Sequence, residues 1–248
     1  MPLEIGYRDF FFKHIELKLD SFDNSLSGVK IIQLSDLHIT KKVKVEYLRE
    51  LVDKINSYNA DMVLFSGDII QTKATHIQEQ LSVFKNLNAH SYFVSGNHDI
   101  FFGLDELKEI MSKNSVICLD NDIVNVKIRD KELQIVGLSD RYSFIRGIKR
   151  EVSELFSKLD ATKETILLTH QPKDIEYIKE YRIDLQLSGH THKGQIFPFS
   201  LLVKLVQPYF YGLYKKNNTL LYVTSGFGYW GLNVRYKAKS EIPVFTIG

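Results

Sequence analysis

Carboxylate, amide and imidazole side chains stand at the ends of five short apolar runs in this sequence. They are Asp36, His38, Asp68, Asn97, His170, His190 and His192. Oxygen and imidazole ligands without thiolate suit Mn, Fe or Zn, whereas Ca and Mg prefer nearly all-oxygen ligands and structural zinc prefers cysteine. Seven ligands exceed what one tetrahedral ion needs. Two divalent metal ions about 3.5 to 4 Å apart, bridged by one carboxylate, would use all seven and would act on both oxygens of a phosphoryl transfer.

Each of these residues also has an ordinary structural interpretation when it is taken alone. An Asp after a strand is more often a turn or helix-cap residue, and Asn97 after a glycine is common in turns. An isolated His170 is more often a hydrogen-bonded core or surface histidine. The joint pattern favours a site, because five of the eight histidines stand in these clusters, the fifth being His98. The histidines outside the clusters are His14, His76 and His90.

The apolar runs that precede these residues have the length and composition of buried strands. They cover residues 29–34, 62–65, 92–94, 166–169 and 185–187. Apolar residues at helical spacing lie between them, within residues 45–55, 77–84 and 152–159. Alternating strands and helices predict a largely parallel sheet, in which the loops at the carboxyl ends of the strands gather the active residues. Residues 123–137 turn at Arg129-Asp130-Lys131 and predict a hairpin, which adds antiparallel pairing.

Length and composition predict one compact domain over residues 1–248. The chain is 44% hydrophobic and 25% charged, which is ordinary for a globular protein. A net charge of +2 argues against a dedicated nucleic-acid binder, and the one local basic cluster, Lys41, Lys42 and Lys44, is more typical of a solvated surface. The single cysteine, Cys118, cannot form an intramolecular disulfide. Without a long apolar run or a signal-peptide pattern, we expect a cytoplasmic protein.

Five motifs in order give the sequence a resemblance to the calcineurin-like metallophosphoesterases. The motifs are Asp36-Leu37-His38, Gly67-Asp68, Gly96-Asn97-His98-Asp99, His170 and Gly189-His190-Thr191-His192. The resemblance runs from about residue 29 to the end of the chain. It implies an α/β fold, a four-layer α/β/β/α sandwich of two mixed sheets, and the strand pattern is compatible with that fold.

The resemblance also implies a role for each residue of the motifs. The ligands of the first metal ion would be Asp36, His38 and His192. The ligands of the second would be Asn97, His170 and His190. Asp68 would bridge both ions, His98 would be the catalytic proton donor, and Asp99 would orient the His98 ring. The implied reaction is hydrolysis of a phosphomonoester or phosphodiester by a metal-activated hydroxide, and a histidine suits protonation of the leaving alkoxide.

Within that family, the sequence most resembles bacterial membrane-associated or cell-wall-associated phosphoesterases. The resemblance lies in Gly194-Gln195-Ile196-Phe197-Pro198-Phe199 and Gly228-Tyr229-Trp230-Gly231. Two positions depart from the expected pattern, since Lys193 replaces a glycine and Ser225 replaces an arginine. The metal ligands are unaffected, and Lys193 or Arg235 would then replace the missing arginine as the anion contact.

Residues 198–214 are apolar and aromatic, with Lys204 as their single charge. Two interpretations are open. The segment is either a buried helix and strand that complete the core, or an exposed lip beside the active-site loop. Leu201, Leu202, Leu205 and Val206 recur at helical spacing, and a lip with these residues would suit a lipid-linked substrate or peripheral membrane contact.

The favoured function is hydrolysis of a membrane-related phosphate ester, and three other functions stay open. A UDP-acyl-sugar pyrophosphatase of lipid A synthesis belongs to the same class, and that activity occurs among similar proteins. A non-catalytic metal-binding scaffold belongs to another class, and the intact pair His98-Asp99 argues against it. A nuclease would have Lys41, Lys42 and Lys44 as its local basic cluster.

Overall fold

In the part of the chain that the structure describes, the strands form two six-stranded mixed sheets and one small two-stranded pair. The computed structural model describes residues 4–5, 10–19, 22–178 and 180–248. The expectation that the N-terminal segment is not a signal peptide concerns residues that lie mostly outside these ranges. The first sheet has the order β2 (Phe10–Leu17), β14 (Ser240–Ile247), β3 (Lys30–Leu34), β4 (Met62–Phe65), β5 (His90–Phe93) and β6 (Val116–Cys118). The second has the order β11 (Gly212–Lys216), β12 (Thr219–Val223), β10 (Leu185–Ser188), β9 (Thr165–Thr169), β8 (Lys131–Leu138) and β7 (Asp122–Ile128). The small pair is β1 (Glu4–Ile5) with β13 (Val234–Arg235).

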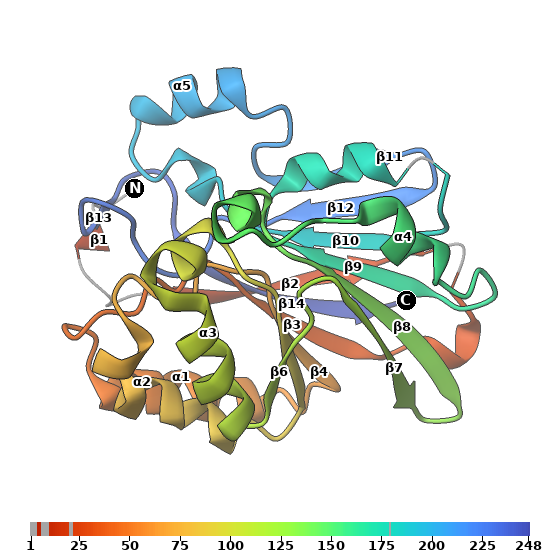
Figure 1. The fold of residues 1–248 in the computed structure, drawn as a ribbon, viewed down its shortest axis with the longest axis horizontal. Helices are drawn as coiled ribbons and strands as arrows, with labels where there is room; N and C mark the ends of the chain where they lie inside the picture. Colours follow the sequence, from red (N-terminus) through yellow and green to blue (C-terminus); the bar gives the residue numbers. More distant parts are fainter. Residues whose placement is uncertain (1–3, 6–9, 20–21, 179) are drawn as a thin grey trace.

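Five α-helices and six 3-10 turns connect the strands in the described part of the chain (Figure 1). The helices are α1 (Val45–Ser57), α2 (Gln78–Ser82), α3 (Asn97–Lys113), α4 (Val152–Ser157) and α5 (Phe199–Val206). The turns are η1 (Asn24–Leu26), η2 (Ala74–His76), η3 (Val83–Asn86), η4 (Arg141–Arg146), η5 (Pro172–Tyr177) and η6 (His192–Gly194).

The centre of each sheet is parallel, as the alternation of strands and helices predicts. Strands β3 to β6 run parallel to one another, and so do β8, β9, β10 and β12. Strand β14 is antiparallel to β3 and parallel to β2. Strands β7 and β11 are antiparallel edges of the second sheet, and β7 with β8 forms the predicted hairpin. All the strands that precede the candidate ligands therefore end in parallel regions.

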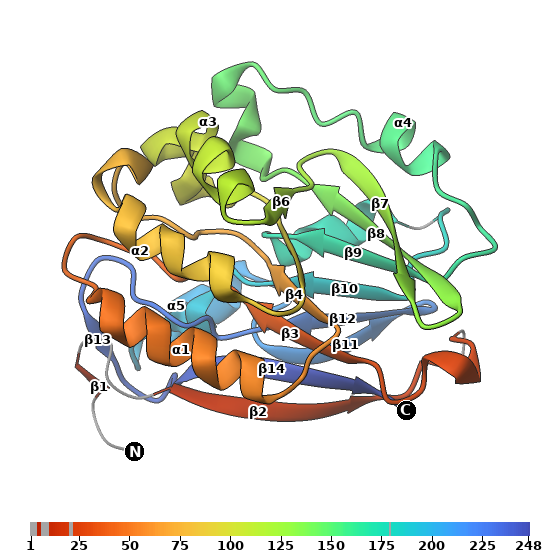
Figure 2. The same cartoon turned by 90° about the horizontal axis from the view of Figure 1, so that it is seen from below.

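The strands are apolar on both faces because each sheet is covered on both sides. Ile31 and Leu64 face the second sheet, whereas Ile32 and Val63 pack against the helical layer that contains α1. On the far face of the second sheet, Val136, Leu167 and η5 pack with α4 through another cluster. Figure 2 shows α1, α2 and α3 on one side and α4 on the other. The expected four-layer α/β/β/α arrangement is confirmed.

Three helices have features that the sequence patterns did not predict. The predicted helix over 77–84 is divided into α2 and the turn η3. Helix α3 is kinked at Gly103, whose φ of 122° only glycine adopts readily. Helix α5 has no buried residue, so the buried-core interpretation of this part of 198–214 is wrong. In the described ranges, no helix has the length and apolarity needed to cross a bilayer.

The contrast between the core and α5 gives a test of the fold. Leu64 is fully buried between the sheets, and we expect Leu64→Ala to lower the free energy of unfolding by about 2 to 5 kcal/mol. Leu202 on α5 is 59% exposed, and Leu202→Ala should change that free energy by less than about 0.5 kcal/mol. Urea unfolding followed by circular dichroism measures both variants. Equal losses in the two would contradict the exposed position of α5.

Candidate metal centre

The candidate ligands leave the carboxyl ends of five strands that belong to both sheets. Asp36 and His38 follow β3, Asp68 follows β4, and Asn97 and His98 begin α3 after β5. From the second sheet, His170 follows β9, His190 follows β10, and His192 begins η6. The chain crosses from one sheet to the other between these residues, and the fold brings their side chains together.

Asp36, His38 and His192 form the first ligand group. One ligand atom from each residue lies within 4.8 Å of the other two. His192 Nε2 lies 3.2 Å from Asp36 Oδ1 and 3.0 Å from His38 Nε2. Burial lowers the pKa of His38 to about 3, so its imidazole is neutral at physiological pH and its lone pair is available to a cation. Although burial opposes ionisation of Asp36, the neighbouring His192 lowers the pKa of this carboxyl.

Asp68 belongs to two further ligand groups. It meets His38 and His98 in one group and Asp36 and His170 in the other. Its Oδ2 atom lies 3.2 Å from His170 Nε2 and 3.7 Å from His38 Nε2. Asp68 therefore lies between candidate ligands of the first sheet and those of the second, where a carboxylate that bridged two cations would have to lie.

His190 adjoins this second half of the centre through His170. The Nδ1 atom of His190 lies 3.2 Å from His170 Nε2. Burial and the adjacent His170 lower the pKa of His190 to about 4, so this imidazole is also neutral at physiological pH. The His170 pKa moves the other way, because Asp68 outweighs the effect of burial and raises it well above its ordinary value. A cation at this position would replace the proton between His170 and Asp68.

Two buried polar atoms fit a metal site better than an ion-free cluster. Asn97 Oδ1 and His98 Nδ1 are shielded from solvent and have no hydrogen-bond partner among the described residues. A buried polar atom without a partner costs about 1 to 3 kcal/mol. Asn97 precedes His98, whose backbone N–H donates to Asp68, and a cation held by Asn97 Oδ1 would account for the lack of a protein partner at that oxygen. The donor set of carboxylate, amide and imidazole fits two divalent transition-metal ions.

Hydrogen bonds behind the ligands orient them. His170 Nδ1 lies 2.8 Å from the carbonyl of Ser66, to which it donates, and His38 Nδ1 lies 2.6 Å from Gln71 Oε1. Both bonds leave Nε2 directed into the centre as the ligand atom. The Asp36 carboxylate accepts from Ser35 Oγ at 2.6 Å. The sequence motifs did not include Ser66 or Gln71, and only the fold shows what they contact.

Several candidate ligands have a backbone conformation that L-residues rarely adopt. The residues and their positive φ angles are Asp36 (55°), His38 (47°), Asp68 (54°), His190 (70°) and His192 (50°). Such conformations cost of order 1 to 3 kcal/mol each where they are strained, and they concentrate at functional sites. The packed sheets hold each loop in a sharp turn directly after its strand.

Two glycines allow the loops to approach the carboxylates. A Cβ atom on Gly96 would collide with Oδ1 and the backbone nitrogen of Asp68. A Cβ atom on Gly189 would collide with Oδ2 of Asp36 and with the Ser35 hydroxyl. Gly96 is therefore needed for the close approach of two neighbouring loops of the first sheet, and Gly189 for the close approach of the two sheets at the centre.

His98 lies beside the ligands, and the hydrogen bonds of Asp99 go to backbone N–H groups instead of the His98 ring. The backbone N–H of His98 donates to Asp68 Oδ1 at 2.8 Å, and the His98 ring lies edge-on to His38 with centroids 4.6 Å apart. The Asp99 carboxylate accepts from the backbone N–H groups of Gly96 and Ile70, at 2.9 and 3.0 Å. This bonding caps the first turn of α3, and it differs from the implied orientation of the His98 ring by Asp99.

Arg235 and Lys193, the two expected anion contacts, both have protein partners in the structure. Arg235 is fully buried and donates to the carbonyls of Gly228 and Ser225, and its Nη2 lies 3.1 Å from His192 Nδ1. It therefore supports His192 and the loop behind Asp36. The ammonium of Lys193 lies 4.1 Å from the centroid of the Tyr211 ring.

Comparisons with known proteins agree with this geometry. Residues 29–194 match the calcineurin-like phosphoesterase family. A Helicobacter pylori protein named an uncharacterized metallophosphoesterase is 37% identical over 240 residues, which are 95% of this chain and 63% of that protein. A Danio rerio protein named a transmembrane protein with metallophosphoesterase domain is 30% identical over 240 residues, which are 92% of this chain and 55% of that protein. The chain thus spans less than two thirds of either relative.

A solved structure shares the fold. It is a dimetal phosphatase from Danio rerio, with a TM-score of 0.53 and 10% identity, covering 81% of this chain and 88% of that one. The family match covers most of the chain, and its ordered motifs supply the residues that meet at the ends of the two sheets. The chain therefore belongs to the calcineurin-like phosphoesterase family.

Proposed function

We propose that this chain hydrolyses phosphate esters at a centre of two divalent metal ions, Mn, Fe or Zn. The observation that carries the proposal is the position of Asp68, whose carboxylate belongs to ligand groups from both sheets. The ligands of one ion are Asp36, His38 and His192. The ligands of the other are Asn97, His170 and His190. Because each ion takes ligands from both sheets, the chain acts as one domain.

In this proposal, the protein residues position the substrate and the metal ions, and the metal ions supply positive charge at the reacting phosphate. When bound, the two cations act as Lewis acids that activate water and neutralise the phosphoryl oxygens. His98 is the proton donor to the leaving alkoxide, because its Nδ1 has no partner among the described residues and one of its ring nitrogens lies within 4.8 Å of ligand atoms of His38 and Asp68. Asp99 is a positioning residue, since its bonds to Gly96 and Ile70 hold the turn that carries His98.

The substrate is membrane-related in this proposal, because an apolar surface adjoins the metal centre. Helix α5 packs on η6, which begins at His192, and Figure 1 shows α5 projecting above the sheets. Leu202 is 59% exposed and Leu205 is 82% exposed. A surface of this kind marks a binding site for an apolar partner.

The positive charge of the sequence around α5 favours an anionic partner. Residues 185–240 contain seven Lys or Arg residues and no Asp or Glu. Lys204 on α5 and the nearby Lys237 are exposed, and the Lys237 ammonium lies 4.2 Å from the centroid of the Phe197 ring. Exposed leucines flanked by lysines suit the surface of a bilayer that contains anionic lipids. We therefore propose that α5 attaches the protein peripherally to such a bilayer.

The bridging role of Asp68 predicts a loss of metal. Asp68→Asn removes the charge that balances both cations, so we expect the variant to lose most of its metal and nearly all of its activity. Elemental analysis of the purified proteins measures metal per chain, and an aryl phosphodiester measures turnover. The matched control is Asp61→Asn, because Asp61 accepts the backbone N–H of Lys30 at the opposite ends of the strands. Full metal content in Asp68→Asn would refute the bridging role, and a parent protein that binds two ions without turnover would be a scaffold.

The general-acid role of His98 predicts a dependence on the leaving group. His98→Asn should retain metal while kcat for an alkyl phosphodiester falls by roughly 100-fold or more. A nitrophenyl ester needs less protonation of its leaving group, so its kcat should fall less. Steady-state rates with both esters and elemental analysis give the answer. An equal fall of kcat for both esters would exclude His98 as the proton donor. Loss of metal from His98→Asn would instead identify His98 as a metal ligand.

The membrane surface predicts binding to vesicles that depends on α5. Leu202→Glu should weaken co-sedimentation with vesicles of phosphatidylcholine and phosphatidylglycerol about 10-fold, because burial of one leucine contributes about 1.5 to 3 kcal/mol. The matched control is Ile117→Glu, since Ile117 is 52% exposed on the edge strand β6. Vesicles of phosphatidylcholine alone should bind the parent less, and thermal melts verify folding. Unchanged binding of Leu202→Glu would exclude α5 as the docking surface.

A further inference from the structure

A cavity of about 770 Å³ lies between the turn η4, the start of α4 and the end of η5. None of the candidate metal ligands lines it. Its walls include the side chains of Arg141, Phe144, Lys149, Arg150, Glu151 and Tyr177. Figure 2 shows the green segment between β8 and α4 passing beside α3 on its way to α4. The cavity therefore lies on the α3 side of the metal centre, whereas α5 packs on η6.

Positive charge exceeds negative charge in the cavity wall. Arg141 Nε and Arg150 Nη2 share the single carboxylate of Asp174, at 2.9 and 2.6 Å, and Thr169 also donates to that carboxylate. Lys149 adds a third cation and Glu151 adds one anion. Arg150 Nε is shielded from solvent and has no hydrogen-bond partner in the described part of the chain. Guanidinium N–H groups in this arrangement match the oxygens of a phosphate.

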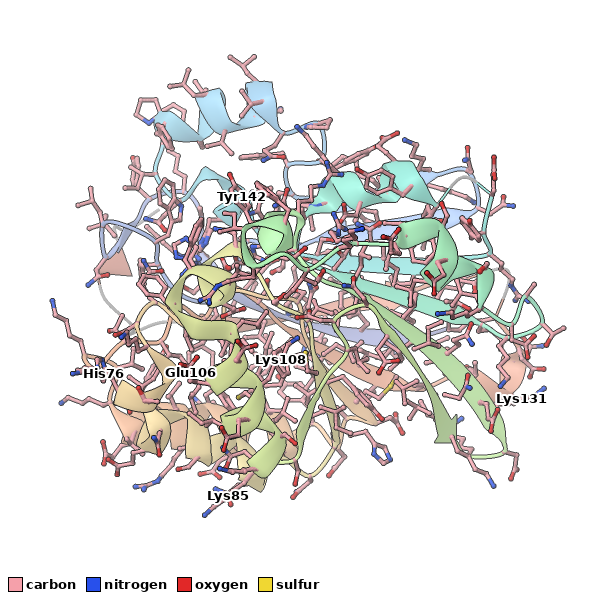
Figure 3. All side chains as sticks on the ribbon, in the orientation of Figure 1. His76, Lys85, Glu106, Lys108, Lys131 and Tyr142 are labelled. Atoms are coloured by element: carbon pink, nitrogen blue, oxygen red, sulfur yellow. The ribbon has the colours of Figure 1, made fainter. Side chains whose placement is uncertain are left out.

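Two groups of contacting aromatic rings lie on α3 and η4, one beside the metal centre and one beside the cavity. His98 lies against Phe102, with ring centroids 6.0 Å apart, and the preceding residue, Phe101, contacts Tyr142 of η4 at 5.6 Å. Tyr142 then stacks on Phe144 at 6.3 Å. Figure 3 shows Tyr142 on η4, above helix α3. Phe144 is 71% exposed at the cavity and offers a face to a planar or apolar group.

Hydrogen bonds also connect the wall of the cavity to residues that adjoin the candidate ligands. Gln171 follows His170 directly, and its Nε2 donates to Asp140 at 2.9 Å. Asp140 is the residue before η4, and its carboxylate caps that turn. On the other side, Arg146 donates to the carbonyl of Ile100 in α3, at 3.2 Å. Residues next to His170 and residues of α3 therefore both hold the wall of the cavity in place.

We propose that this cavity is a subsite for a second phosphate group of the substrate, apart from the phosphate ester that is hydrolysed. The inference rests on the proposed hydrolysis of phosphate esters and narrows its substrate class to esters that carry two phosphates. The guanidinium groups of Arg141 and Arg150 bind the second phosphate with Lys149, and the ring of Phe144 contacts the part that joins the two phosphates.

Two substrates that differ only in the second phosphate test the inference. They are thymidine 5′-(4-nitrophenyl phosphate) and its 3′-phosphorylated counterpart, and both release 4-nitrophenol. The metal-loaded parent should prefer the second by about 10-fold in kcat/KM, since one charge-assisted hydrogen bond contributes about 1.5 to 3 kcal/mol. Arg141→Gln and Lys149→Gln should each reduce this preference several-fold. Lys158→Gln is the matched control, because Lys158 pairs with Glu154 and does not line the cavity.

A binding measurement separates this inference from the proposed hydrolysis. Calorimetric titration of inorganic pyrophosphate into chelator-treated protein, with folding checked by thermal melt, should show one site in the parent. Lys149→Gln should weaken it several-fold, and Lys158→Gln should not. Binding without turnover would support the anion site and contradict the hydrolysis. Turnover with equal kcat/KM for the two substrates would overturn the inference, and binding together with equal kcat/KM would assign the cavity to a free anion instead.

Discussion

Two carboxylates, Asp36 and Asp68, are buried where the carboxyl ends of two sheets meet. Burying ionised groups costs several kcal/mol each unless opposite charges and hydrogen bonds compensate. Imidazoles from the other sheet supply part of that compensation, since His192 adjoins Asp36 and His170 adjoins Asp68 at 3.2 Å. Backbone N–H groups of His190 and His98 supply more. The charge balance of the centre therefore depends on the two sheets being held together, and two cations would strengthen the same connection.

The geometry of the loops follows from this constraint. Each ligand must turn inwards within one or two residues of its strand, so the backbone takes positive φ at Asp36, Asp68 and His190. The loops keep these unfavourable conformations because their strands are packed on both faces and cannot shift. Gly96 and Gly189 leave room for the carboxylates. A side chain at Gly96 would displace the neighbouring loop of the same sheet, and one at Gly189 would push the two sheets apart. The rigid layers and the strained loops thus depend on each other.

The sequence predicted the features that depend on local pattern. Apolar runs such as residues 62–65 are strands, and the hairpin at Arg129 to Lys131 is present. The roles of Arg235 and Asp99 were not predictable, because each depends on contacts that exist only in the folded chain. The sequence suggested Arg235 as a contact for the substrate anion, but in the structure Arg235 is buried and donates to the loop carbonyls of Ser225 and Gly228. Asp99 stands third in a helix, where its carboxylate turns back to the backbone N–H of Gly96.

Helix α5 shows that the spacing of apolar residues does not predict whether a helix is buried. Its leucines have helical spacing, as do those of α1, yet α1 buries Leu48, Leu51 and Val52 whereas α5 buries none of its residues. Periodicity cannot distinguish them, because the difference lies in what each helix packs against. The charge of the surrounding chain is more informative, since an acid-free stretch from 185 to 240 makes an anionic partner favourable for α5. In the proposed function, the metal centre then lies between a cationic apolar surface beside η6 and a cationic cavity beside α3, and an elongated substrate with anionic groups at two places matches that arrangement of charge.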